Sequence, residues 1–188
     1  LKELADGRFK GRLGWAPGNA SLHAHVSALI SLWGAEGTRQ WLVAMKAQQP
    51  VVYPKNSPQV LAVDKGEIDV GWVNHYYLHK LRAKDPSLKA ANASFSAAGD
   101  AGNVLMLAGV GIPKHSARKA LARRLAAFLL SREAQEYFAQ TGYEYPVVPG
   151  VPTHADVPAL SAALAEVPQA ALTEFDAALA MLRSLGLH

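Results

Sequence analysis

The sequence predicts an α/β fold in which helices flank a mixed, mostly parallel sheet. Short apolar runs that resemble strands alternate with helix-like segments of ten or more residues, and this alternation is typical of α/β domains. Turn residues separate the segments. The chain has 188 residues, of which half are hydrophobic and 18% are charged. That length and composition are enough to bury a substantial core.

The first half of the chain carries clear start and stop signals. Asn19 or Ser21 can cap a helix after the turn residues Pro17-Gly18. Ser57-Pro58 is typical of a helix start, and Gly66 of a helix end. The predicted elements are, in order, a strand at 12–16, a helix to about residue 34, a helix over 36–48, a strand at 51–53, a helix over 58–66, a strand at 68–73 and a helix over 76–84.

The second half is predicted to contain one more strand and several helices. Residues 104–112 form an apolar stretch bounded by glycines, which favours a strand. Ser116 is predicted to cap a helix whose inner face carries Leu121, Leu125, Phe128 and Leu129. Ser131 is predicted to start a helix that ends at Gly142. The alanine-rich stretch 157–185 is predicted to be helical, with a break near Pro168.

Composition and motifs narrow the functional classes. The chain has no cysteine, so thiol nucleophiles, thiolate metal sites and disulfides are excluded. No apolar run approaches the length of a transmembrane span. The net charge of +4 suits small anions, whereas nucleic-acid binding would need a clustered basic stripe with aromatic residues. No hydrolase, zinc-protease, phosphate-loop or dinucleotide motif occurs, so we expect a binding protein and not an enzyme.

Three loops carry asparagines where predicted strands end. Asn19 lies in "APGNAS", Asn56 in "YPKNSP" and Asn74 in "VNHYY". Ligands of open α/β sheets bind beyond the carboxyl ends of the strands, and helix starts there favour anions. Asparagine is also a common turn residue, so each loop alone is compatible with a purely structural role. Together the three loops predict a shared anion site.

The adjacent phenols of Tyr76 and Tyr77 are the most distinctive feature of the third loop. In the first turn of a helix they lie about 100° apart and can converge on one object. A phenol has a pKa of about 10, so only a strong Lewis acid such as ferric iron makes it an anionic ligand. The residues alone also allow the two rings to be core packing. His75 is a candidate for contacting the tyrosine ligands without binding the metal itself, and His79 is expected to face solvent.

Several segments together resemble the periplasmic ferric-iron-binding proteins of bacterial ABC importers. These segments are "FKGRLGWAP", "GEIDVGWVNHYYLHKLRA", "AGDAGNVLMLAGVGI", "AAFLLSREAQEYFA" and "YEYPVV", which occur in the family's order over residues 9–148. The Asn-x-Tyr-Tyr element at residues 74–77 is the most specific of them. The resemblance implies class II periplasmic-binding-protein-like lobes that close on Fe(III).

The resemblance also implies roles for individual residues. Tyr76 and Tyr77 match the family's iron ligands. A synergistic anion, phosphate or carbonate, completes the coordination sphere in many members. The positions that match its binders are Asn19, Ala20, Ser21, Asn56 and Asn74. The first loop lacks the third tyrosine that one subgroup has, which favours the anion-assisted type. The implied partner is an ABC importer permease, and the implied location is periplasmic.

The N-terminal part of the family's proteins, which forms most of their first lobe, has no counterpart in this sequence. On the resemblance, residues 1–100 correspond to the second lobe, residues 101–150 return to the first lobe, and residues 151–188 pack back on the second. The sequence therefore reads as a truncated chain with an incomplete iron site. We expect its returning segment to be an exposed remnant, or to be covered by an oligomer or a swapped partner.

Two alternatives remain on the residues alone. One is a protein that binds a small anion of the phosphonate or sulfate type, with the tyrosines as hydrogen-bond donors. The other is an effector-sensing domain of similar fold, which would need an attached DNA-binding element.

Overall fold

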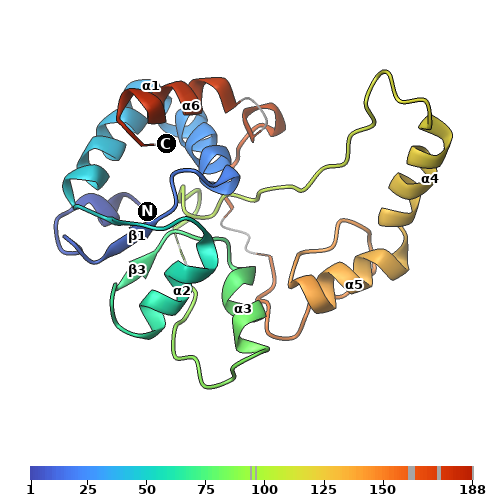
Figure 1. The fold of residues 1–188 in the computed structure, drawn as a ribbon, viewed down its shortest axis with the longest axis horizontal. Helices are drawn as coiled ribbons and strands as arrows, with labels where there is room; N and C mark the ends of the chain where they lie inside the picture. The colour runs from blue at the N-terminus through green and yellow to red at the C-terminus, as the bar shows by residue number, and fades with distance from the viewer. Residues whose placement is uncertain (94, 96, 161–163, 173–174, 188) are drawn as a thin grey trace. The chain divides into compact units, whose positions relative to one another are not determined.

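The computed structural model describes residues 1–93, 95, 97–160, 164–172 and 175–187. The chain forms two compact units (Figure 1). The first contains residues 1–106 and 162–188, and the second contains residues 107–161. No helix in the described ranges has the length and apolar character needed to cross a membrane.

A parallel sheet forms the centre of the first unit. Its order is β2-β1-β3, with β1 at Leu13–Trp15, β2 at Val51–Val52 and β3 at Val70–Gly71. The central strand pairs in parallel with both neighbours. The α/β class is thereby confirmed. All three of these strands are shorter than the sequence predicts.

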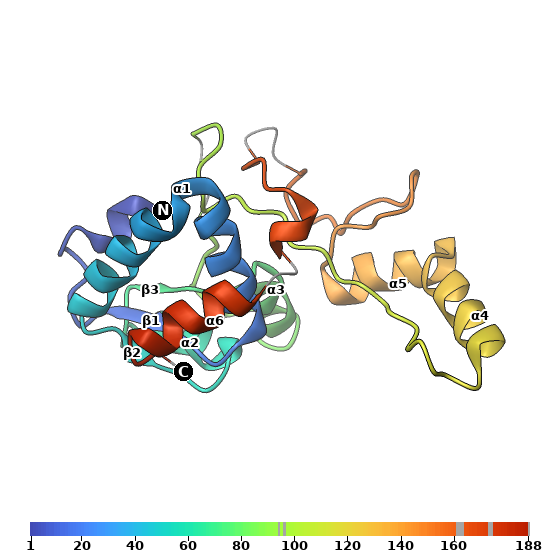
Figure 2. The same cartoon turned by 90° about the horizontal axis from the view of Figure 1, so that it is seen from above.

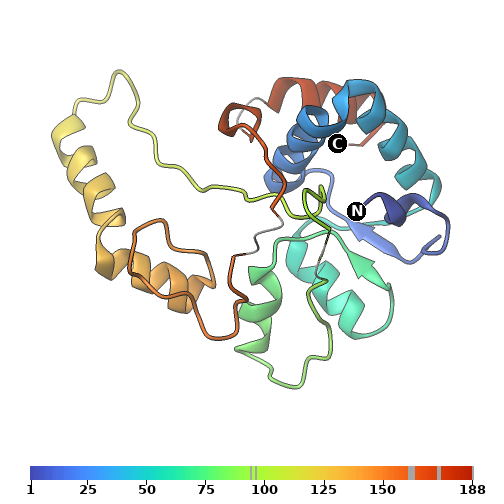
Figure 3. The ribbon, with the colours of Figure 1, turned by 180° about the vertical axis from the view of Figure 1, so that it is seen from behind.

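Helices cover the two faces of this sheet (Figures 1 and 3). On one face lie α1 (Ala20–Ala47) and α6 (Phe175–Ser184), with the short 3-10 helices η1 (Lys2–Ala5) and η2 (Gln169–Leu172) beside α1. On the other lie α2 (Asn56–Asp64) and α3 (Tyr76–Arg82). The predicted pair of helices at 20–34 and 36–48 is one assigned helix with a kink at Gly34, where φ is 74°.

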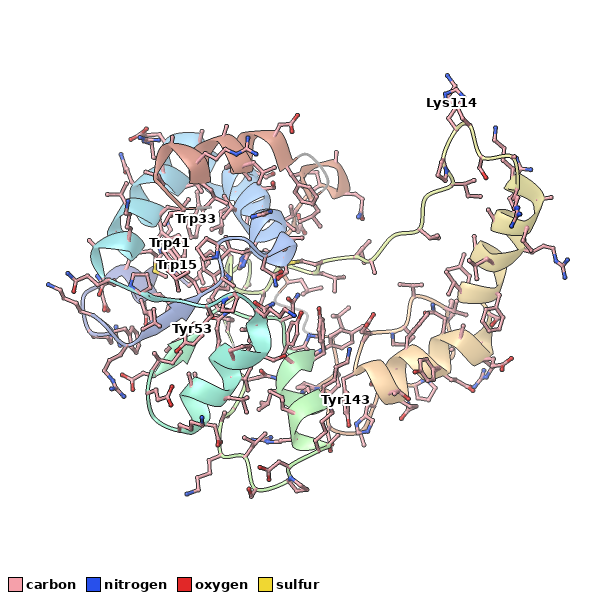
Figure 4. The ribbon with its side chains drawn as sticks, in the orientation of Figure 1. Trp15, Trp33, Trp41, Tyr53, Lys114 and Tyr143 are labelled. Carbon is pink, nitrogen blue, oxygen red and sulfur yellow. The ribbon has the colours of Figure 1, made fainter. Side chains whose placement is uncertain are left out.

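The larger core cluster lies between the sheet and the α1–α6 face. It contains Leu13 and Trp15 of the sheet, Leu29 and Leu42 of α1, and Leu182 of α6, all 2% exposed or less. Figure 4 shows Trp15, Trp33 and Trp41 gathered in this interior. A smaller cluster under α2 and α3 is formed by Val60, Leu78 and Ala90. The sheet is therefore covered on both faces, as parallel sheets generally are.

Gly71 allows α2 to lie close to the sheet, and Gly14 leaves room for Ile68 and Tyr53 beside the sheet. A Cβ atom on Gly71 would lie 3.1 Å from Cβ of Gln59, and one on Gly14 would lie 2.6 Å from Cδ1 of Ile68 and 3.0 Å from the Tyr53 ring. Each glycine precedes a tryptophan in the sequence; Gly71 ends β3 and faces Gln59 of α2, whereas Trp15 of β1 packs in the larger core cluster. This close approach fixes the position of the N-terminus of α2.

The second unit contains α4 (Lys119–Leu129) and α5 (Arg132–Gly142). Figure 2 shows a long extended connection that leads into α4. The Ser131 hydroxyl accepts a hydrogen bond from the Ala134 N–H at 3.3 Å, which confirms the predicted start of α5. The helix ends at Gly142, and Tyr143 after it is left-handed with φ of 58°.

Several predictions for the second half are wrong. Residues 104–112 are extended but carry no strand assignment, because no neighbouring segment among the described residues offers a backbone ladder. The predicted inner face of α4 is exposed at Leu121, Leu125 and Phe128, since α5 is the element that α4 contacts. In the stretch 157–185, the described residues 157–160 and 164–168 are not helical, and regular structure is limited to η2 and α6.

Two predicted helix caps also differ. The helix predicted to begin at Pro58 after a Ser57 cap starts two residues earlier, at Asn56, with Lys55 at the cap position and no side-chain cap bond. Before α4 the cap position is Arg118, while the Ser116 hydroxyl accepts the Arg118 N–H at 3.2 Å. Ser57 is therefore the second residue of α2, whereas Ser116 forms a local turn ahead of α4.

Candidate functional site

The three asparagine-bearing loops lie at one edge of the sheet. Each follows a strand and leads into a helix: β1 into α1, β2 into α2, and β3 into α3. Because the three strands are parallel, their carboxyl ends meet at the same edge. The predicted site residues are thereby brought together from segments up to 58 positions apart, from Asn19 to Tyr77.

Hydrogen bonds join four of the five predicted anion-binding residues. Asn19 Oδ1 caps α1 by accepting the Ser21 N–H at 3.0 Å and the Ser21 hydroxyl at 2.9 Å. The Asn56 amide nitrogen donates to Ser21 Oγ at 3.2 Å and to Asn74 Oδ1 at 3.4 Å. The last two bonds are long, and long bonds are weak, so they can be exchanged for stronger bonds to an anion. Ala20 is the first residue of α1.

Donors remain available in this network. Within the described part of the chain, no hydrogen bond occupies Nδ2 of Asn19 or Nδ2 of Asn74. The network also lies at the N-termini of α1 and α2, where backbone N–H groups and the helix dipole favour negative charge. An anion placed here would meet neutral donors and two partial positive charges.

A second layer of residues supports the network, and the sequence analysis missed it. Gln59 is fully buried; its amide nitrogen donates to Asn56 Oδ1 at 3.3 Å and its Oε1 accepts the Trp72 N–H at 3.1 Å. The Trp72 indole N–H in turn donates to His25 Nδ1 at 2.8 Å. The spacing of Gln59 three residues after Asn56 places both on one face of α2 and is the signal that could have revealed it.

The tautomer of His25 follows from its two partners. Nδ1 accepts from Trp72, so Nε2 carries the proton and donates to the Ala101 carbonyl at 2.6 Å. Burial lowers the pKa of His25 to about 4. The imidazole is therefore neutral near neutral pH and joins α1, the end of β3 and residue 101.

Tyr76 and Tyr77 are the first two residues of α3, as the sequence predicts. Their ring centroids are 4.6 Å apart with an interplanar angle of 34°. The Lys80 ammonium lies 4.6 Å from the centre of the Tyr76 ring. Tyr77 also packs against the cluster of Val60 and Leu78, so part of its ring does contribute to packing. Both residues are half-buried, and Asn74 lies just ahead of them in the same loop.

The two neighbouring histidines differ from each other in exposure. His75 precedes α3, and its ring lies 5.6 Å from Tyr76 in an edge-to-face arrangement. His79 is buried, so the expectation that it faces solvent is wrong; Asn92 lies 3.3 Å from its Nε2. Among the described residues, no three His, Cys, Asp or Glu side chains are grouped closely enough to hold a metal.

Comparison with known proteins gives a consistent picture. A sequence model of the family described as bacterial extracellular solute-binding protein matches residues 1–171. The major ferric iron-binding protein of Neisseria meningitidis is 32% identical over 145 residues, which cover 77% of this chain and 44% of that protein. Iron uptake protein A1 of Synechocystis is 33% identical over 165 residues, covering 83% of this chain and 45% of that protein.

The solved structure of iron-bound HitA from Pseudomonas aeruginosa superposes with a TM-score of 0.88 at 29% identity, covering 99% of this chain and 60% of that one. The chain thus spans less than half the length of the two curated relatives. Those relatives are named for iron binding and iron uptake, which are not enzyme activities.

Proposed function

Because the chain belongs to the bacterial extracellular solute-binding protein family, we propose that it takes part in capturing ferric iron outside the cytoplasm. Tyr76 and Tyr77 bind the iron as phenolates. A small anion, phosphate or carbonate, occupies the polar network and fills further coordination positions. The loaded protein delivers its cargo to an ABC importer permease.

The main observation behind this proposal is that two different groups of side chains lie next to each other at one edge of the sheet. One group is the pair of adjacent phenol rings at the start of α3, which are tilted by 34° relative to each other. The other is the amide and hydroxyl network of Asn19, Ser21, Asn56 and Asn74. Asn74 belongs to the network and lies in the same loop as the phenols, so a metal on the phenols and an anion on the amides would be neighbours.

The chemistry of the two ligands fits this arrangement. Ferric iron is a hard Lewis acid that displaces the phenol protons and favours anionic oxygen. Two phenolates leave positions for an anion, which neutral amides and helix N-termini hold without competing for the metal. His75, edge-on to Tyr76, supports the ring of that ligand. The similarity to a ferric iron-binding protein of Neisseria meningitidis and to iron-bound HitA supports the choice of metal.

The division of the chain fits a two-lobed binding protein. We assign residues 1–100 and 151–188 to the lobe that carries the tyrosines, and residues 101–150 to the other lobe.

The proposal is tested by titrating the protein with Fe(III) in the presence of phosphate or carbonate. Binding through phenolates produces a visible charge-transfer band. Tyr76→Phe and Tyr77→Phe should each weaken or abolish the band, whereas Tyr137→Phe serves as the control because its phenol lies in α5 and is 63% exposed. A parent protein without the band, or with a band equal to that of both site variants, would contradict the iron assignment.

The network also favours a second function. Nδ2 of Asn19 and Nδ2 of Asn74, which no hydrogen bond occupies in the described part of the chain, could hold a small anion without any metal. The tyrosines would then act as hydrogen-bond donors. Calorimetry with phosphate or sulfate in metal-free buffer separates the two functions, because heat without iron supports the anion binder.

A further inference from the structure

The hydrogen bonds behind the site form a closed circuit through three elements. Ser21 and Asn56 join α1 to α2, and Gln59 joins α2 to the backbone of Trp72 after β3. The indole of Trp72 then returns to α1 through His25. Since Ser21 and His25 are four residues apart, they lie one turn apart on the same face of α1 and complete the circuit.

His25 has a further contact that leads away from the site. Its Nε2 donates to the carbonyl of Ala101, shortly before the chain enters the second unit at residue 107. The segment that returns from the second unit is bonded close to this point: the Ala165 N–H donates to the Asn103 carbonyl at 3.0 Å. One buried ring thus holds both the loop that carries the tyrosines and the outgoing connection.

We propose that His25 is a positioning residue for ligand capture: its two ring nitrogens hold Trp72 and Ala101 in fixed register, and Trp72 sets the position of the Asn74–Tyr77 loop. The inference rests on the proposed function, because the loop matters only as a ligand-binding loop. His25 acts through Trp72 and Ala101, which are the partners of its two ring nitrogens.

The neighbourhood of Trp72 explains why the position is specific. The indole is held at its N–H by His25 and at its face by the Trp41 ring, with centroids 5.4 Å apart and nearly perpendicular planes. The backbone N–H of Trp72 is shared between Gly14 O at 3.0 Å and Gln59 Oε1. Two residues later the chain reaches Asn74. Because its indole N–H, its ring and its backbone N–H all have partners, Trp72 restricts the backbone conformations that residues 73–77 can adopt.

The test compares variants that keep or remove single bonds. His25→Phe retains a ring and loses both hydrogen bonds. His25→Asn can still accept from the Trp72 indole, and His25→Gln can still donate to Ala101. The control is Trp33→Phe, which alters an aromatic side chain in the same core without touching the circuit. Affinity is measured with Fe(III) and phosphate through the charge-transfer band, and folding through thermal unfolding.

We expect His25→Phe to weaken the affinity tenfold or more, His25→Asn to recover part of it, and Trp33→Phe to stay within twofold of the parent. Equal losses for His25→Phe and Trp33→Phe, or no recovery with His25→Asn, would overturn the proposal. If His25→Phe does not fold, Trp72→Phe replaces it, because this change removes the indole N–H and leaves the histidine in place.

Hydrogen exchange separates this inference from the proposed function. In metal-free buffer, the His25 variants should exchange faster at residues 72–77 and 101–106 than the parent and the Trp33→Phe control. If the parent protein gives no iron band but the His25 variants exchange faster than the parent, the proposed function is wrong while His25 still positions the loop. Unchanged exchange in both segments would overturn the positioning role whatever the iron result.

Discussion

Helices α1 and α4 are both amphipathic by sequence, but they differ completely in burial. α1 buries ten residues, and its Leu29 and Leu42 side chains are fully enclosed between the sheet and α6. α4, every residue of which is described, has none buried, and its Leu121 and Leu125 are 57% and 55% exposed. The apolar stripe of α1 has a sheet to cover, whereas the neighbouring element of α4 in the described part of the chain is the single helix α5.

The difference shows what periodicity can and cannot predict. An apolar residue every three or four positions indicates a helix with one apolar face. It does not indicate which surface covers that face, since this depends on segments elsewhere in the chain. The stability of α1 therefore comes mainly from packing, while α4 has local propensity and one helical neighbour.

The largest expected effect contrasts one leucine in each helix. Leu42→Ala in α1 should lower the free energy of unfolding by about 2–5 kcal/mol, because it leaves a cavity in a closed core. Leu125→Ala in α4 should change it by less than about 0.5 kcal/mol. Urea denaturation followed by tryptophan fluorescence reports on the first unit, which holds all four tryptophans. Hydrogen exchange reports on α4. A large loss for Leu125→Ala would mean that its face is covered in solution.

The next prediction concerns the pH dependence of stability, which we expect to differ between the two units. His25 in the first unit has its pKa lowered by burial from 6.5 to about 4. Between these two values the unfolded chain binds a proton that the folded chain does not, so stability falls as the pH is lowered. The loss reaches about 3 kcal/mol near pH 4.

The measurement for this prediction is urea denaturation from pH 7 to pH 4.5 on the parent and on His25→Gln. Carboxylates titrate in both proteins, so the difference between the two curves isolates the histidine. Parallel curves would contradict the prediction. Exchange at α4 and α5 should not follow this difference, because the second unit does not contain His25.

A smaller effect tests the close approach of α2. Gly71→Ala places a methyl group 3.1 Å from Cβ of Gln59, so α2 must move by a few tenths of an ångström. We expect a loss of about 1–3 kcal/mol and weaker binding of iron with phosphate, because Asn56 moves with the helix. The control is Gly109→Ala, where an added Cβ would meet nothing within 4 Å. If Gly71→Ala behaved like this control, the contact would not determine the position of α2.

The sequence predicted local features well where the deciding contacts are local. The Ser131 cap, the end of α5 at Gly142 and the start of α3 at Tyr76 all depend on residues within one turn. The gathering of Asn19, Asn56 and Asn74 also followed from the rule that parallel strands end at one edge.

Features that depend on distant partners were mispredicted or missed. The strand at 104–112 was expected from composition, but a strand also needs a neighbour to bond with. The roles of Gln59 and His25 depend on Trp72, which lies 13 and 47 positions away from them. No local pattern identifies such bonds, because a buried histidine and an exposed one look alike in the sequence.

The smallest expected effect compares the two side-chain caps. Ser131→Ala removes one bond at the start of α5 and should cost about 1 kcal/mol, confined to the second unit. Asn19→Ala removes two bonds to Ser21 at the start of α1 and should cost about 1–2 kcal/mol. It also releases the Ser21 hydroxyl, which then no longer holds a fixed orientation toward Asn56.

Iron and phosphate binding distinguishes these caps where stability alone does not. Asn19→Ala should weaken binding beyond its effect on stability, and Ser131→Ala should leave binding unchanged in a chain that remains folded. Asn19→Ser keeps an oxygen at the cap but loses the amide nitrogen, so it should restore stability without fully restoring binding. Full recovery of both by Asn19→Ser would mean that Asn19 serves only as a helix cap. The anion would then depend on Asn56 and Asn74 for its side-chain amides.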